Sequence, residues 1–157
     1  MNGQSNRALW VSVLACLGMA CDSTSLGPHI DLAAAQSRWE ASGVTSYDFD
    51  LRVSCFCGPT AVGPVTISIR DGQFTGAVSI DNGAPVDSLY FQGFLTIDRV
   101  FATLHGVLDA GPAAFTASYD ADLGFPTHVS YDGDTQIADD ELALQVLAVR
   151  PLGVPIR

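Results

Sequence analysis

A strict alternation of apolar and polar residues between positions 46 and 55 is the clearest pattern in the chain. Its apolar members are Tyr47, Phe49, Leu51, Val53 and Cys55. Neighbouring side chains of a strand point to opposite faces of a sheet, so the alternation predicts a strand that is buried on one side only. Two further strands are predicted at 65–70 and 74–81, and the Asp71-Gly72 pair between them is typical of a hairpin turn.

Two other segments repeat their apolar residues with the 3.6-residue period of an α-helix. The first helix is predicted over residues 32–42, with Asp31 as its N-cap and Gly43 as its end. Its apolar positions are Leu32, Ala35 and Trp39. The second helix begins after Thr96 and ends before Gly111. Its apolar positions are Ile97, Val100, Phe101, Leu104 and Leu108.

Two more strands are predicted at 114–120 and 127–131, whereas the tail at 141–149 fits either a strand or a helix. The elements therefore run helix, three strands, helix, and then two or three strands. This order predicts an α+β fold in which two helices pack on one face of an antiparallel sheet. It also suggests a duplicated unit of one helix plus β-strands.

The N-terminal segment has the pattern of a bacterial lipoprotein signal. Arg7 precedes an apolar stretch at 8–18, which at about 11 residues is shorter than the roughly 20 that a membrane-spanning helix needs. Ala20 then stands directly before Cys21, as a small residue does before a lipidated cysteine. The predicted parts are a signal peptide at 1–20, an acylated Cys21 with a short tether at 21–30, and a single α+β domain at 31–157.

Two alternatives to this assignment stay open. Cys16, which follows Ala15, also fits the residue types expected at a lipidated cysteine, and a plain secretory signal cut after Ala20 would leave Cys21 as a free thiol. With either cysteine lipidated, the domain is expected in the bacterial cell envelope, outside the cytoplasm. Its contact with a membrane would then be made by the acyl chains.

Charge limits the classes of partner. The chain has a net charge of −10, contains no lysine, and loses Arg7 with the predicted signal, so the mature charge is −11. Such a surface repels the phosphates of nucleic acids and anionic lipid headgroups. We therefore expect no nucleic-acid partner, and we expect the lipid rather than charge to hold the protein at its membrane.

Cys55 and Cys57 are the most chemically distinctive residues of the predicted domain. Residues two apart in a strand share a face, so the two thiols could join in an oxidising compartment if Gly58-Pro59 bends the chain. Two buried free thiols, or a redox or soft-metal site, are the alternatives. No His, Met, Lys or Arg stands immediately beside the pair, which weakens the last of these.

Tyr90, Phe91 and Phe94 lie in an irregular segment, although loops are normally polar. We predict that they form a contact surface; the alternative is that their rings cap the open end of the core.

Acidic clusters at 120–122 and 132–141 could supply oxygens to calcium, but they lack the spacing of an EF-hand and fit ordinary turns. We therefore expect no metal and no cofactor.

Several of these features together resemble an uncharacterised family of bacterial envelope lipoproteins. They are Trp39 in the opening helix, Tyr47-Asp-Phe49, Cys55-Phe-Cys57-Gly-Pro59, Thr96-Ile-Asp98, Tyr119-Asp120 followed by Gly124-Phe125-Pro126, and Asp139-Asp140-Glu141. The resemblance extends from about Gln36 to Leu152. It implies a domain of unknown function, an envelope location and a strand rather than a helix for the tail, and it supplies no catalytic residue.

Motifs for catalysis are absent from the sequence. It contains no nucleophile elbow, zinc-binding His-Glu-x-x-His, phosphate-binding loop or dinucleotide-binding glycine pattern, and it has no lysine for Schiff-base chemistry. We therefore predict that the chain is not an enzyme. The expected function is a lipid-anchored envelope protein that binds an unidentified envelope protein or ligand through its sheet face and the 90–94 aromatics. A thiol-redox or soft-metal protein that uses Cys55 and Cys57 is the alternative.

Overall fold

The computed structural model describes residues 27–55, 63–137 and 141–153. Two α-helices, one 3₁₀-helix and six strands make up this part of the chain. In order they are α1 (Pro28–Ser42), β1 (Tyr47–Cys55), β2 (Val65–Arg70), β3 (Gln73–Ser79), η1 (Ser88–Phe94), α2 (Ile97–Ala110), β4 (Ala114–Tyr119), β5 (Pro126–Asp132) and β6 (Leu142–Pro151). No helix among these residues is long and apolar enough to cross a membrane.

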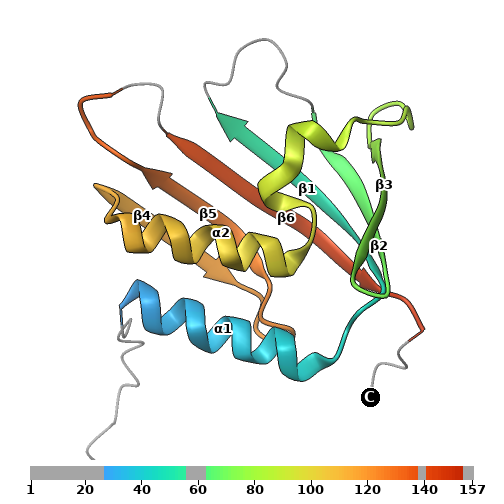
Figure 1. Ribbon diagram of the computed structural model, residues 1–157, viewed down its shortest axis with the longest axis horizontal. Coiled ribbons are helices and arrows are strands. Elements are labelled where there is room, and N and C mark those ends of the chain that lie inside the picture. The colour runs from blue at the N-terminus through green and yellow to red at the C-terminus, as the bar shows by residue number, and fades with distance from the viewer. Residues whose placement is uncertain (1–26, 56–62, 138–140, 154–157) are drawn as a thin grey trace, which may run out of the picture.

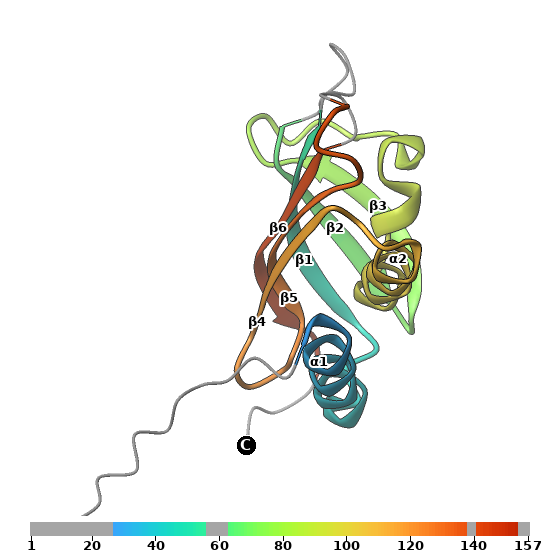
Figure 2. The same ribbon diagram turned by 90° about the vertical axis from the view of Figure 1, so that its left-hand side faces the viewer.

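The six strands form one antiparallel sheet in the order β3-β2-β1-β6-β5-β4. Both α-helices lie on the same face of this sheet, and no helix of the described residues lies on the opposite face (Figures 1 and 2). The predicted α+β class is therefore confirmed. The tail is a strand, and β6 pairs with β1 in the centre of the sheet.

The suggested duplication is not confirmed by this arrangement. A helix followed by three strands does occur twice along the chain. However, the first strand of the first group, β1, lies in the centre of the sheet, whereas the first strand of the second group, β4, lies at an edge. The two groups thus agree in element order, but their corresponding strands occupy different positions.

The beginning of α1 differs from the prediction. The helix begins at Pro28, its N-cap is Gly27, and no side chain caps it; Asp31 lies within the first turn instead. Proline suits the first helical position because it has no N–H to leave unpaired there, and its fixed φ favours the helix. Asp31 still stabilises this end, because a carboxylate is favourable near the positive end of the helix dipole.

The limits of α2 follow the prediction. Thr96 is the N-cap, and its side chain accepts a hydrogen bond from the backbone N–H of Arg99 at 3.1 Å. Gly111 closes the helix in a left-handed conformation. The predicted hairpin between β2 and β3 is also present, with positive φ at both Asp71 and Gly72, as a two-residue turn of this type requires.

The core lies between the sheet and the two α-helices. The side chains of Leu32, Ala35 and Trp39 from α1 are buried there, as are Tyr47, Phe49 and Leu51 from β1. All five apolar positions predicted for α2 are buried as well. The interior therefore consists of the faces that the two periodicities selected.

Gly124 fixes the distance between α1 and the turn that precedes β5. It has a φ of +84°, and a Cβ at this position would overlap the carbonyl oxygen of Ala35 and lie 2.8 Å from Cβ of Arg38. Only glycine meets both conditions, because a side chain is strained at this φ and would collide with the helix. Phe125 follows in the buried set. The turn thus brings an aromatic anchor close to α1.

Candidate binding face of the sheet

The face of the sheet without helices carries the polar half of the β1 alternation. Tyr47, Phe49 and Leu51 are fully buried on the helix side, so the intervening Asp48 and Asp50 point to the other side. The register sets Asp48 opposite Ser68 of β2 and Arg150 of β6. We call the side of β1, β2, β5 and β6 that faces away from the helices the helix-free face.

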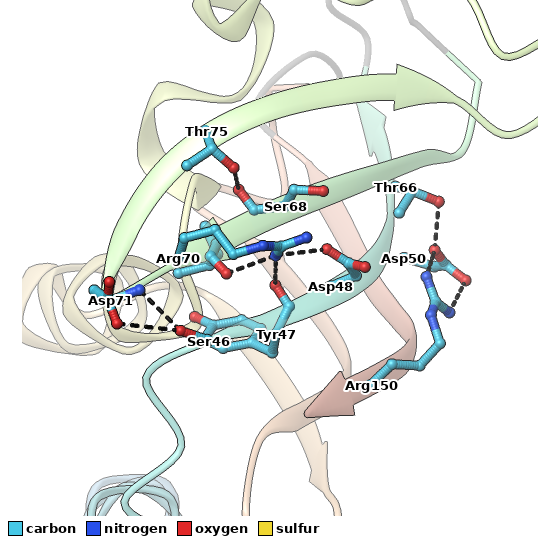
Figure 3. Close-up of polar contacts among 11 residues, drawn as sticks. Ser46, Tyr47, Asp48, Asp50, Thr66, Ser68, Arg70, Asp71, Thr75 and Arg150 are labelled. Carbon is cyan, nitrogen blue, oxygen red and sulfur yellow. Dashed lines mark hydrogen bonds and ion pairs between the residues drawn. The ribbon is translucent and has the colours of Figure 1, made fainter. Parts of the chain in front are cut away.

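Two aspartate–arginine ion pairs order this face (Figure 3). Nη1 of Arg70 lies 2.9 Å from Oδ1 of Asp48 and also donates to the backbone carbonyl of Tyr47 at 3.2 Å. Arg150 forms a two-pronged contact with Asp50, with both N···O distances at 2.7 Å. The hydroxyl of Thr66 donates a third hydrogen bond to Asp50 at 2.7 Å.

The pKa values of both carboxyls are shifted by these contacts. The hydrogen bond from Arg150 is the largest influence on Asp50; with the bond from Thr66 it outweighs partial burial and lowers the pKa of Asp50. For Asp48 partial burial is the largest single influence and acts upward, but bonds from Arg70 and Ser68 overcome it, and the pKa is lowered. Both aspartates are therefore charged at neutral pH.

A second polar row crosses four strands beside these ion pairs. Arg52 is opposite Gln145 of β6, Gln145 is opposite His128 of β5, and His128 is opposite Ser118 of β4. Nε2 of Gln145 lies 3.4 Å from Nδ1 of His128. Arg52 is exposed and has no hydrogen bond or ion pair with another residue in the described ranges. It is therefore available to an external group.

Charge on the helix-free face differs from charge on the chain as a whole. On β1, β2 and β6 the charged residues of this face are Arg52, Arg70 and Arg150 against Asp48 and Asp50, and Asp132 at the end of β5 is a third acidic residue. The face therefore has as many positive as negative groups, whereas the chain has a net charge of −10. Physiological salt largely screens exposed charges that are more than about 8 Å apart, so Arg52 would attract a negatively charged group at shorter range only.

A separate polar cluster joins the helices to the sheet and is part of the core. Nε1 of Trp39 donates to Asp98 at 3.0 Å, and the Tyr47 hydroxyl accepts from the backbone N–H of Ile97 at 3.0 Å. The Trp39 and Tyr47 rings meet edge to face with centroids 5.2 Å apart. Burial raises the pKa of Tyr47 to about 12; the bond from Ile97 acts downward, and the charge of Asp98 acts upward.

This cluster accounts for Trp39 as a core residue. Its side chain is only 3% exposed, and its polar atom is satisfied within the protein. The cluster connects α1, β1 and the beginning of α2 across sequence separations of 50 and 59 residues. Sequence reasoning missed these bonds because no local pattern pairs residues so far apart.

The predicted aromatic contact surface is divided by the structure. Phe91 is 3% exposed and belongs to the core, and Phe94 packs against the core partly buried. Tyr90 is 51% exposed and Leu89 beside it is 66% exposed. For Phe91 and Phe94 this favours the alternative that the rings close the core. Phe91 lies at a kink within η1, where its backbone is not helical (φ −131°, ψ 20°). Only Tyr90 of the three is positioned for contact.

The structure describes one of the four cysteines and most of the residues in the acidic clusters. Cys55 is the last residue of β1, while Cys57 and the two candidate lipid sites, Cys16 and Cys21, lie outside the described residues. Asp120 accepts backbone hydrogen bonds from residues 122 and 123, and Asp134 accepts one from residue 136, as turn-forming aspartates do. Within the described ranges no group of His, Cys, Asp and Glu is arranged to hold a metal ion.

Comparison with known proteins gives a family but no function. Neither the curated proteins nor the solved structures include a match to this chain. The model of a family of unknown function, DUF6174, matches residues 31–151. These limits nearly coincide with α1 to β6 and with the extent of the resemblance seen in the sequence. The chain therefore belongs to the DUF6174 family of unknown function.

Proposed function

We propose that this protein is a lipid-anchored component of the bacterial cell envelope that binds a partner through its helix-free face and catalyses no reaction. The observation that carries the proposal is the row Arg52–Gln145–His128, which adjoins two ion pairs on a sheet face without a helix. The partner would present a negatively charged group to Arg52.

The ion pairs support a binding role because they hold the surface in one arrangement. Arg150 is fixed by two bonds to Asp50, and Asp50 is fixed in turn by Thr66. A surface whose side chains are already ordered loses less conformational entropy on binding, which favours affinity. Among the described residues of this face, Arg52 then supplies the one guanidinium that a partner can engage without breaking an ion pair to Asp48 or Asp50.

Site-specific photo-crosslinking in the native membrane tests the binding face. A photoreactive amino acid is placed at His128, and a matched control carries it at Ala34, an exposed position on α1. We expect one defined adduct from His128, which Arg52→Ala should abolish, and none from Ala34. Arg70→Ala, in which the neighbouring pair is lost but Arg52 remains, should keep the adduct made from His128. Equal adducts from Ala34 would overturn the binding face.

The anchor is tested by intact mass spectrometry of protein extracted from membranes. The proposal expects a chain that begins at Cys21 and carries acyl groups, and Cys21→Ser should leave an unlipidated precursor. Cys16→Ser should still be processed. Acylation that persists in Cys21→Ser but is lost in Cys16→Ser would assign the lipid to Cys16.

The thiol-redox or soft-metal alternative depends on Cys55 and Cys57. Alkylation before and after reduction, read in the same mass spectra, shows whether the two thiols are joined. A Cys55→Ser/Cys57→Ser double variant that folds normally and still gives the His128 adduct supports the binding role. A double variant that folds normally but loses an envelope phenotype kept by the Arg52→Ala variant would favour the thiol function instead.

A further inference from the structure

The two edge strands of the sheet, β3 and β4, differ in how far their outer backbone groups are paired. At the β3 edge a return segment forms an isolated bridge between Val78 and Pro85. Ser79 donates its N–H to the carbonyl of Ala84 at 2.8 Å, and Val86 donates to Ala77 at 2.9 Å. Pairing between β2 and β3 also shifts register after Ser68, which distorts the outer strand. Covering segments, prolines and bulges are the usual devices that prevent an edge strand from pairing further.

Within the residues described, the β4 edge has no covering segment and no proline, and its pairing with β5 shifts register only at the end of the strand, between Ser118 and Tyr119. Ala113 donates to Gly133 of the neighbouring strand segment at 3.3 Å, and bonded pairs alternate along an antiparallel ladder. The β4 residues whose backbone groups form hydrogen bonds with β5 are therefore Phe115 and Ala117. The backbone groups of Ala114, Thr116 and Ser118 point away from β5, and no hydrogen bond from them to another described segment is present.

The composition of β4 leaves this edge open to pairing. The strand reads Ala-Phe-Thr-Ala-Ser-Tyr, without a charge or a proline, and its register with β5 is regular over five residue pairs from Ala114 to Ser118. Ala114, Thr116 and Ser118 are exposed. A regular, uncharged edge strand with free backbone groups is a template for one more strand.

Charge at the two ends of β4 indicates the kind of strand that fits. Asp120 and Asp122 follow its C-terminal end, and Asp132 is opposite Ala114 at the other end, with Asp134 two residues further on. Two-fold antiparallel pairing of β4 with the same strand of a second copy would set the C-terminal end of each strand beside the N-terminal end of the other. Both ends are flanked by aspartates, so a second copy of this chain is disfavoured.

We infer that the β4 edge accepts an extended segment of another protein as a seventh strand, with a neutral middle and a basic residue near each end. Backbone hydrogen bonds to Ala114, Thr116 and Ser118 would supply the affinity, and the flanking aspartates would select the basic ends. This site goes beyond the helix-free face and does not depend on it.

A synthetic peptide of alternating Thr and Val with an Arg at each end is the probe. NMR-detected amide exchange on the full-length mature protein should show slower exchange of the Ala114, Thr116 and Ser118 amides when peptide is added. The same peptide with alternate backbone nitrogens methylated should give no protection. A version with Asp at each end should bind at least about tenfold more weakly at low salt, with the difference falling as salt is raised.

Two proline variants test the backbone geometry. Thr116→Pro removes an outward-pointing N–H, so it should leave the fold intact and abolish protection by the peptide. Ala117→Pro removes an N–H that bonds to β5, so it should lower the melting temperature. This result would verify that inward- and outward-pointing N–H groups alternate along β4. If Thr116→Pro does not fold, the pair Asp122→Asn with Asp134→Asn replaces it. That pair should weaken binding of the Arg-ended peptide without affecting a peptide that has neutral ends.

Three results would overturn the inference. The first is no change in the β4 amides at millimolar peptide. The second is protection that appears on β3 or on the helix-free face instead of β4. The third is protection of β4 that depends on protein concentration without peptide, which would make a second copy the occupant.

Discussion

The two faces of β1 show how one strand carries two different kinds of stabilisation. On the helix side, Tyr47, Phe49 and Leu51 are at most 1% exposed and pack against α1, α2 and the neighbouring strands. On the other side, Asp48 and Asp50 form ion pairs with arginines whose side chains are 43% and 47% exposed. The two sets of side chains alternate along the same strand, so they share one backbone conformation and differ only in their surroundings.

This difference separates the buried apolar side chains, which stabilise the fold, from the exposed polar side chains, which are available for binding. Burial of apolar area contributes about 25 cal/mol per Å², whereas exposed ion pairs contribute about 0–1 kcal/mol each. Substitutions on the helix side should therefore change the free energy of unfolding strongly. Substitutions on the helix-free face should change it little and should act on binding instead.

The largest effect is expected from Phe49→Ala. The ring is fully buried beside Tyr47, so its loss should lower the free energy of unfolding by about 3–5 kcal/mol. The matched control is Arg52→Ala on the same strand, which should change the free energy by less than about 0.5 kcal/mol. Chemical denaturation followed by circular dichroism measures both. Equal losses in the two variants would mean that the faces do not differ as described.

A smaller effect is expected from Tyr47→Phe, which keeps the ring but removes the hydroxyl. The backbone N–H of Ile97 would lose its buried acceptor at the beginning of α2, at a cost of about 1–2 kcal/mol. Tyr90→Phe is the control, because Tyr90 is 51% exposed and its hydroxyl is not part of the core. A negligible cost for Tyr47→Phe would show that the hydroxyl does not stabilise the helix.

The same tyrosine gives a pH dependence with a definite sign. Burial raises the pKa of Tyr47 from 10.0 to about 12, so the unfolded chain loses this proton at a lower pH than the folded protein. The stabilisation is therefore complete below pH 10 and is lost as the pH rises towards about 12. Tyr47→Phe should make alkaline unfolding less steep. Part of the slope should remain, because burial also raises the pKa of Tyr119 to about 12.

The smallest effect is expected from the Asp50–Arg150 pair. A double-mutant cycle of Asp50→Ala and Arg150→Ala should give a coupling energy below about 1 kcal/mol, and high salt should reduce it. Because the pKa of Asp50 is lowered, its contribution is present above pH 3.8 and is lost as the pH falls through the lowered value. A coupling of several kcal/mol would place this pair among the determinants of the fold.

Local patterns were sufficient wherever the structure depends on periodicity. The alternation at 46–55 identified the buried side of β1, and the helical period identified every buried apolar position of α2. The prediction was wrong at the N-cap of α1, where Pro28 allows the helix to begin before Asp31. It was also incomplete at η1, where a kink between two helical turns places Phe91 in the core. Both errors lie where the chain changes from one conformation to another and periodicity gives little information.

The sequence by itself determined the class of fold, the faces of its elements and the excess of negative charge, because these depend on residue type and spacing. Only the tertiary structure placed β6 beside β1 and thereby brought Arg150 to Asp50 and Gln145 to Arg52. It alone also showed that a return segment covers the β3 edge, whereas no described segment pairs with the outer side of β4. Such features depend on which strands become neighbours, and contacts between residues as much as 100 positions apart leave no local pattern in the chain.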